Sequence, residues 1–407
     1  MKSRAAAAPW ERNLTYCALA EVLIILSSQA SFNLIPYYIQ QMGLTEPRAV
    51  TAYTAAYQSV GLITFAIFTP IWGMLSDRYG RKPLFMRAIA ATCVTCAMMA
   101  LARTPGQLMA ARVVQGCMTG TPTAASVLVA TGTPRHRRAY ALGLVQTAVS
   151  VGVTIGPMIG GVVADTLSYR ATYWGATLLV FIALVIVALR VTEPEDSEAV
   201  TAQARSQHPL VALKDLGRSR PFVLLLGITL ALNLAISLQS PVIPIYIQQL
   251  VGSTDRIATV SGLVTGLAGL TMAGSALLIG RAIDRIGART ALLASTWGTA
   301  ALYVPLAFNN SIWGLGLLQA IQGACKGGIS PGISTLVVNR TRPEKIGVAL
   351  GLNTSASSTG SALGPLVGAA IFASLSVRAV FIASALLCLV TIAGLRFVDD
   401  RPDADLV

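Results

Sequence analysis

Two ionisable side chains stand inside long apolar stretches of the chain, where a charge is costly: Glu21 and Arg112, the latter within LMAARVVQG. An arginine in an apolar span costs at least about 2.5 kcal/mol on insertion scales, so Arg112 should face protein and have a partner. A carboxyl removed from water favours its neutral form, so Glu21 can bind and release a proton. Glu21 is the candidate proton carrier, Arg112 is its candidate partner, and Asp165 is a second acidic candidate.

Alternatives stay open at these positions. Glu21 can instead snorkel toward an interface, and Arg112 can simply bond backbone carbonyls between helices. A direct contact between the two is possible on helix geometry. Lys326 is a third ionisable group in an apolar stretch, with three readings: binding an anionic substrate group, pairing with Glu21, or snorkelling.

Polar and aromatic side chains near these charges supply handles for a small molecule. Amides, aromatic rings and one amine in apolar segments favour an amphipathic organic substrate over an inorganic ion. The candidate substrate-binding residues are Gln29, Phe32, Asn33, Tyr37, Gln146, Asn233, Gln239 and Lys326.

Motifs for other chemistries are missing from the sequence. It has no H-x-x-x-H pair and no G-x-x-x-x-G-K loop, so we expect no enzyme, no catalytic residues and no nucleotide or other cofactor. The six cysteines fall in apolar runs, and Cys93-x-x-Cys96 has no flanking histidine or second cysteine pair. We therefore expect no metal site.

Composition indicates a membrane protein. The chain of 407 residues is 54% hydrophobic and 12% charged, with a mean hydropathy of +0.66, against roughly 25% charged residues in soluble domains. The bilayer is therefore the expected partner, in about twelve spans of roughly 20 residues. The expected spans are 13–36, 51–74, 84–102, 106–131, 139–164, 172–191, 221–245, 257–280, 289–308, 312–338, 346–374 and 377–397.

The net charge of +13 is distributed by loop rather than by patch. Of the 30 Lys and Arg residues, 23 fall in or next to one set of alternate loops and five in or next to the other, leaving Arg112 and Lys326 well inside spans. The positive-inside rule then predicts both termini in the cytoplasm and an even number of spans. This pattern indicates a multi-pass protein of the cytoplasmic (inner) membrane and no nucleic-acid partner.

The two halves of the chain repeat each other. PYYIQQ at 36–41 recurs as PIYIQQ at 244–249, an offset of 208, and the pattern of Gly73, Asp77, Arg78 and Gly80 recurs 207 residues later. A parallel repeat predicts two bundles about a pseudo-twofold axis, with a substrate site near the midplane between them. The predicted domains are an N-terminal six-helix bundle (1–191), a cytoplasmic linker (192–220) and a C-terminal six-helix bundle (221–407).

GMLSDRYGRK at 73–82 joins the second and third spans in a very short basic loop. It resembles the signature loop of the major facilitator superfamily, and later motifs fall on the helices where that family places them. The resemblance implies an all-α major facilitator fold and a gating role for this loop. Gly73 is expected to let helices approach closely and Asp77 to latch one conformation. The gating-loop residues are Gly73, Asp77, Arg78, Gly80 and Arg81.

GLVQTAVSVGVTIGPMIGG at 143–161 is a glycine-rich span with a bend expected at Pro157. It resembles the antiporter signature of drug and proton antiporters in this superfamily, which is associated with export; the matching arginine of their fourth span, here Arg112, is tied to proton transfer. Close helix packing explains the same glycines. The motif residues are Gly143, Gly152, Gly156, Pro157 and Gly160.

These features together predict a proton-coupled antiporter that exports hydrophobic or cationic drug-like small molecules. Such a protein is a multidrug efflux transporter of the 12-helix type, and we expect a monomer. The alternative is a dedicated exporter of one metabolite, such as a natural product, sugar or siderophore, on the same fold.

Overall fold

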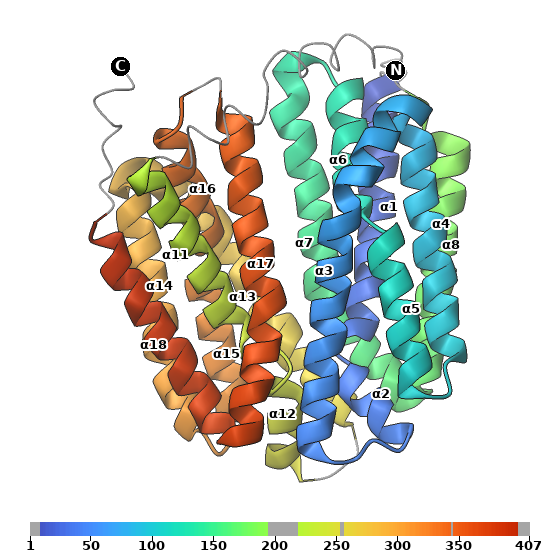
Figure 1. Cartoon of the computed structure of the whole chain (residues 1–407). Coiled ribbons are helices and arrows are strands. Elements are labelled where there is room, and N and C mark those ends of the chain that lie inside the picture. Colours follow the sequence, from blue (N-terminus) through green and yellow to red (C-terminus); the bar gives the residue numbers. More distant parts are fainter. Residues whose placement is uncertain (1–8, 194–218, 253–255, 343–344, 398–407) are drawn as a thin grey trace, which may run out of the picture. The chain divides into compact units, whose positions relative to one another are not determined.

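The computed structural model describes residues 9–193, 219–252, 256–342 and 345–397, and every regular element in these ranges is a helix (Figure 1). The first half contains α1 (Pro9–Phe32), α2 (Ile35–Gln41), α3 (Pro47–Tyr79), α4 (Arg81–Leu101), α5 (Pro105–Met118), α6 (Thr121–Gly132), the short 3-10 helix η1 (Arg135–Arg137), α7 (Arg138–Thr166) and α8 (Tyr169–Arg190). The second half contains α11 (Arg220–Ser237), α12 (Ile243–Val251), α13 (Ile257–Ile286), α14 (Ala288–Phe308), α15 (Ile312–Lys326), α16 (Ile329–Asn339), α17 (Ile346–Ser374) and α18 (Val377–Leu395).

Eleven stretches of the described chain are long and apolar enough to cross a membrane. The all-α membrane fold expected from the sequence is therefore confirmed. The expected tenth span, 312–338, needs correction because it consists of two shorter helices, α15 and α16, with Gly327 and Gly328 between them. A Cβ at Gly328 would lie 2.9 Å from the Ile279 Cγ2 atom of α13, so the glycines let that helix approach the joint.

The described chain divides into two compact units. Unit 1 comprises residues 1–35 and 64–206 and contains α1, the C-terminal part of α3, and α4 to α8. In it, α1 packs against α7 and α8 and, less extensively, α6, while α4 packs against α8, α5 and α6. Helix α1 is thus the central helix of unit 1.

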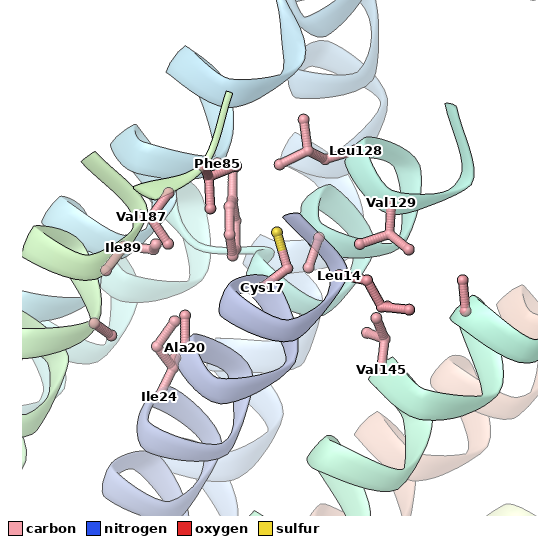
Figure 2. Packing of buried hydrophobic residues seen from close by; sticks show 14 of the residues in the cluster. Leu14, Cys17, Ala20, Ile24, Phe85, Ile89, Leu128, Val129, Val145 and Val187 are labelled. Carbon is pink, nitrogen blue, oxygen red and sulfur yellow. The ribbon is translucent and has the colours of Figure 1, made fainter. Parts of the chain in front are cut away.

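The core of unit 1 forms around α1 (Figure 2). Leu14, Cys17, Ala20 and Ile24 project from α1 into a cluster of buried apolar residues from four other helices. Those partners include Phe85 and Ile89 of α4, Leu128 and Val129 of α6, Val145 of α7 and Val187 of α8. Any polar group on this side of α1 is consequently shielded from water.

Unit 2 comprises residues 36–63 and 207–407. The segment 36–63, which the predicted boundaries place in the N-terminal bundle, associates with unit 2 through hydrogen bonds: Tyr37 Oη donates to the Pro244 carbonyl at 2.9 Å and Ser59 Oγ to the Ala362 carbonyl at 2.6 Å. Within unit 2 the main packed pairs are α11 with α17, α13 with α15, and α14 with α18. The boundaries 1–191, 192–220 and 221–407 stay a prediction.

The same close packing of glycines recurs in both units. A Cβ on Gly152 of α7 would lie 2.7 Å from the Leu26 amide nitrogen of α1, and one on Gly360 of α17 would lie 3.0 Å from the Leu234 amide nitrogen of α11. Both pairs of positions are 208 residues apart, the repeat offset of the sequence. The α7 helix continues through Pro157 without interruption, so the glycine face of α7 lies directly on α1.

Candidate functional site

Glu21 lies at the middle of α1 on its core-facing stripe. Leu14, Cys17, Glu21 and Ile24 follow each other at spacings of three, four and three residues, which places them on one side of a helix. The side chain of Glu21 is 0% exposed. It therefore does not snorkel to a surface of the molecule.

The surroundings of the Glu21 carboxyl offer it little polar compensation. Thr121, the first residue of α6, is its polar neighbour, yet neither carboxyl oxygen has a partner in hydrogen-bonding geometry within the described ranges. An unpaired buried carboxylate is unfavourable by several kcal/mol or more. The arrangement therefore suits a carboxyl that carries its proton.

Arg112 of α5 contacts other groups than Glu21. Its Nη1 atom donates to the Gln115 Oε1 atom one turn further along α5, at 2.5 Å. Its guanidinium carbon also lies 5.4 Å from the centre of the Phe32 ring, within the range of a cation–π interaction. The structure thus does not bring the candidate pair of Arg112 and Glu21 into contact, because Gln115 and Phe32 hold the arginine.

The fourth span is broken beside Glu21. Helix α5 ends at Met118 and α6 begins at Thr121, and Gly120 between them has a φ of 131°, which a residue with a Cβ rarely adopts. Pro122 follows in the first turn of α6, where its missing N–H is tolerated. Trp72 Nε1 donates to the Cys117 carbonyl at 2.7 Å, satisfying a group at the end of α5. The joint therefore positions Thr121 against Glu21.

Unit 2 has a cation at its own joint. Lys326, the last residue of α15, donates from Nζ to the Gln322 Oε1 atom at 2.7 Å, and Gln239 Nε2 reaches the same oxygen at 3.3 Å. Gln322 stands 207 residues after Gln115, so an equivalent amide oxygen accepts from a cation in each unit. Thr229, at the repeat position of Glu21, donates to Asn353 Oδ1 at 2.8 Å. Of the paired positions 21 and 229, only the one in unit 1 therefore carries an ionisable acid.

The predicted gating loop is held inside unit 1 by Glu193, a residue that the sequence analysis missed. Glu193 accepts hydrogen bonds from the Arg81 backbone N–H at 2.7 Å and from the Lys82 backbone N–H at 2.8 Å. Lys82 Nζ donates to the Ala188 carbonyl at the end of α8, at 3.0 Å. Gly80 has a φ of 95° just before α4. Glu193 therefore caps the helix that follows the loop.

Other gating-loop predictions have different outcomes. No atom of another helix in the described structure lies within 4 Å of where a Gly73 Cβ would stand, and the close helix approach expected at this glycine stays a prediction. The side chains of Asp77 and Arg78 lie outside the described part of the structure. In unit 2, Arg289 Nε donates to the Leu395 carbonyl at 3.1 Å, which repeats the Lys82 contact at an offset of 207.

Several of the candidate substrate residues form hydrogen bonds to other groups of the protein. Gln239 bonds Gln322, Tyr37 bonds the Pro244 carbonyl, and Asn233 donates to the Thr229 carbonyl at 2.8 Å. The remaining candidates lie at the C-terminal end of α1, just after it, and on α7: Gln29, Phe32 and Asn33 are half-buried, with Phe32 next to Arg112, and Gln146 is exposed.

The sequence contains signals for two features that the sequence analysis missed, the α5–α6 joint and Gln115. The joint is marked by Thr119-Gly120-Thr121-Pro122, since a proline disfavours helical conformation in the residue before it. Glu193 is an acid just beyond a span whose end must meet the start of another helix, a placement that apolar periodicity does not reveal. Gln115 is visible as the glutamine shared by RVVQG and AIQG.

The fold and these sites define a multi-pass helical membrane protein built from two related units. The family model described as Major Facilitator Superfamily matches residues 17–258 and 234–406. The chain belongs to the major facilitator superfamily, and the protein is accordingly a transporter of small molecules.

Relatives and solved structures agree with this assignment. The chain is 30% identical over 381 residues to multidrug resistance protein MdtG of Enterobacter lignolyticus, covering 93% of this chain and 90% of the relative. It is 29% identical over 376 residues to the protein of that name from Salmonella paratyphi B, covering 92% of each. The nucleoside transporter NupG superposes with a TM-score of 0.76 at 14% identity, over 94% of this chain and 98% of NupG. The human organic anion transporter MFSD10 gives a TM-score of 0.68 at 20% identity, over 95% and 100%.

Proposed function

We propose that the protein is a proton-coupled exporter of hydrophobic or cationic drug-like small molecules. The observation that carries this proposal is the similarity, over at least nine-tenths of both chains, to proteins named multidrug resistance protein MdtG. The glycine motif of α7 supports the direction of transport. The site in unit 1 supports the coupling.

The proposed location is the cytoplasmic membrane, with both termini in the cytoplasm. The supporting observation is the loop asymmetry of 23 basic residues against five. The protein is proposed to work as a monomer, since each chain carries both related units.

Glu21 is the proposed proton carrier. Its carboxyl is fully buried and lacks a hydrogen-bond partner among the described residues, so the neutral form suits this conformation. Release of the proton then requires a second conformation in which water or a cation reaches the carboxyl. Arg112 is one such cation, because a rotation of its side chain away from Gln115 would let the guanidinium approach from α5.

The moving parts are the two predicted six-helix domains. Alternating access in such repeats occurs largely by rocking of one bundle against the other. The close contact of the α7 glycines with the α1 backbone keeps the helix that carries Glu21 attached to α7 during such a movement. A change in the protonation of Glu21 can therefore act on the packed helices of unit 1 together.

Substrate contact is proposed at the outer half of α1 and on the exposed side of α7. Phe32 offers an aromatic face, and Gln29, Asn33 and Gln146 offer amides. Phe32 also contacts Arg112. A substrate that stacks on Phe32 would thus disturb the residue proposed to assist proton release, which links the two events.

Everted membrane vesicles test the proposal. Energised vesicles containing the protein are given structurally dissimilar cationic and neutral hydrophobic compounds, and dissipation of the proton gradient and uptake are followed. Glu21→Gln is expected to reduce uphill uptake to the level of de-energised vesicles while the protein is still made and folded. Glu11→Gln, which neutralises an exposed acid in the first turn of the same helix, is the matched control and should transport normally.

Two results would count against the proposal. Wild-type uptake rates in Glu21→Gln would show that Glu21 is structural. A response to one compound and silence for all dissimilar ones would instead favour the dedicated metabolite exporter.

A further inference from the structure

A cavity of about 110 Å³ lies within unit 1, beside the joint between α5 and α6. Thr119 and Gly120 of the joint form part of its wall, together with residues of α3, α4 and α6. Its lining is apolar at Phe65, Leu84 and Val127, and it has one charged side chain, Arg87. No acidic residue is among the described residues that line it.

Arg87 is held in an unusual way for an arginine. Its guanidinium carbon lies 3.2 Å from the centre of the Trp72 ring, so the two planar groups are in contact. Its Nε and Nη1 atoms are buried and have no hydrogen-bond partner within the described part of the chain. The ring contact holds the guanidinium in place but gives no hydrogen-bond acceptor to the N–H groups of Nε and Nη1.

Trp72 is itself fixed. Its Nε1 atom donates to the Cys117 carbonyl at the end of α5, so the indole cannot turn away without losing that bond. Gly120 is part of the same cavity wall, and a Cβ there would lie 3.3 Å from Phe65 Cε2. Because Trp72 is bonded to the end of α5, the position of the Arg87 guanidinium depends on the α5–α6 joint.

Buried donors on a charged group are unfavourable unless an acceptor, best an anionic one, meets them. An arginine presents its donors in a fork that matches the oxygens of a carboxylate or phosphate. The hydroxyls of Ser76, Thr119 and Thr123 line the same cavity and can add donors. We propose that this cavity binds the anionic headgroup, phosphate or carboxylate, of a membrane amphiphile, with Arg87 as its main ligand.

The residues that line the cavity favour an amphiphile over a free ion as the ligand. Phe65, Leu84 and Val127 line the same cavity as the guanidinium, and such apolar side chains suit an alkyl chain rather than a hydrated ion. Arg87 also lies six residues after the start of α4, about 9 Å along the helix. That depth is within reach of a headgroup at the cytoplasmic interface.

Trp72 provides a direct readout. The other four tryptophans, Trp10, Trp174, Trp297 and Trp313, are replaced by phenylalanine, and Trp72 fluorescence is titrated in the purified protein. The probes are dodecyl phosphate, dodecanoate, dodecyltrimethylammonium and inorganic phosphate. Nanodiscs of phosphatidylglycerol and of phosphatidylcholine provide the lipid comparison.

The expected result is a saturable change with dodecyl phosphate and dodecanoate, and a different Trp72 spectrum in phosphatidylglycerol than in phosphatidylcholine. Arg87→Gln should raise the half-saturating concentration at least tenfold, and Arg87→Lys should weaken binding less because it keeps the charge. Arg190→Gln, which removes an exposed arginine at the end of α8, should bind like the parent.

Three results would overturn the proposal. One is an equal response to dodecyltrimethylammonium, which carries the opposite charge. Another is saturation by inorganic phosphate at the concentration found for dodecyl phosphate, which would make the site one for free anions. The third is an unchanged titration in Arg87→Gln, since Trp72 would then report on detergent alone.

Discussion

Gly143 and Gly156 belong to the same glycine motif on the same helix, yet they have different surroundings. A Cβ on Gly156 would lie 2.7 Å from the Leu26 carbonyl oxygen, 2.8 Å from Gln29 Cβ and 3.1 Å from the Ala30 amide nitrogen. A Cβ on Gly143 would meet nothing within 4 Å. Alanine at the two positions therefore separates the role of packing from the presence of the motif.

The size of the effect follows from those distances. Replacing a glycine inside a helix by alanine gains about 0.5–1 kcal/mol in either position. At Gly156 the new methyl group must be moved by roughly 0.7 Å from backbone atoms to reach ordinary contact, and such overpacking costs about 1–3 kcal/mol. Because the gain is common to both variants, their difference in stability is the packing cost. At roughly 2 °C per kcal/mol, the midpoints should differ by roughly 2–6 °C.

The assay is thermal unfolding of the purified protein in one detergent, followed as the fraction that remains monodisperse after heating. Gly143→Ala should melt at or slightly above the wild-type temperature, and Gly156→Ala below it. Unit 2 offers a repeat of the comparison: Gly351 has no neighbour within 4 Å of a Cβ, whereas one on Gly364 would lie 2.6 Å from Ser237 Cβ.

Equal melting temperatures for Gly143→Ala and Gly156→Ala would refute the reasoning. The same holds if Gly351→Ala is as damaging as Gly364→Ala. Either result would mean that the contact between the glycine helix and its neighbour is loose enough to accept a methyl group.

Two further predictions concern residues at helix ends. Glu193→Ala removes both acceptors of the Arg81 and Lys82 N–H groups and should lower stability by about 1 kcal/mol; thermal unfolding checks this, and an unshifted midpoint would show that water replaces the cap. Lys326→Met removes the cation bound to Gln322 and should reduce uptake of anionic compounds while leaving cationic ones within about twofold; a uniform loss in vesicle uptake would mean that Lys326 only supports the fold.

Hydropathy predicted most of the architecture because a bilayer requires long apolar helices with internal backbone hydrogen bonds. The repeat was visible for a related reason: Gly152 and Gly360 do the same packing task in each half, so the same residue type recurs at a fixed offset. Features imposed by the solvent or by repeated packing are thus readable from one sequence.

Local breaks and long-range contacts were harder to predict. A joint of one or two residues, such as Gly120, scarcely changes the mean hydropathy of a span. The Glu193 cap joins residues more than 100 positions apart, and the Arg87 stack on Trp72 depends on the turn between two helices. Such contacts depend on three-dimensional placement, which periodicity does not encode. The roles of Glu21 and Arg112 stay predictions.

The break in the fourth span has an electrostatic consequence. A helix that begins in the middle of a membrane presents the positive end of its backbone dipole there, equivalent to about half an elementary charge. Helix α6 begins at Thr121, beside the Glu21 carboxyl. The backbone itself thus supplies a fixed partial counter-charge to the anion that proton release would leave, and no side-chain substitution removes it unless the joint closes into a continuous helix.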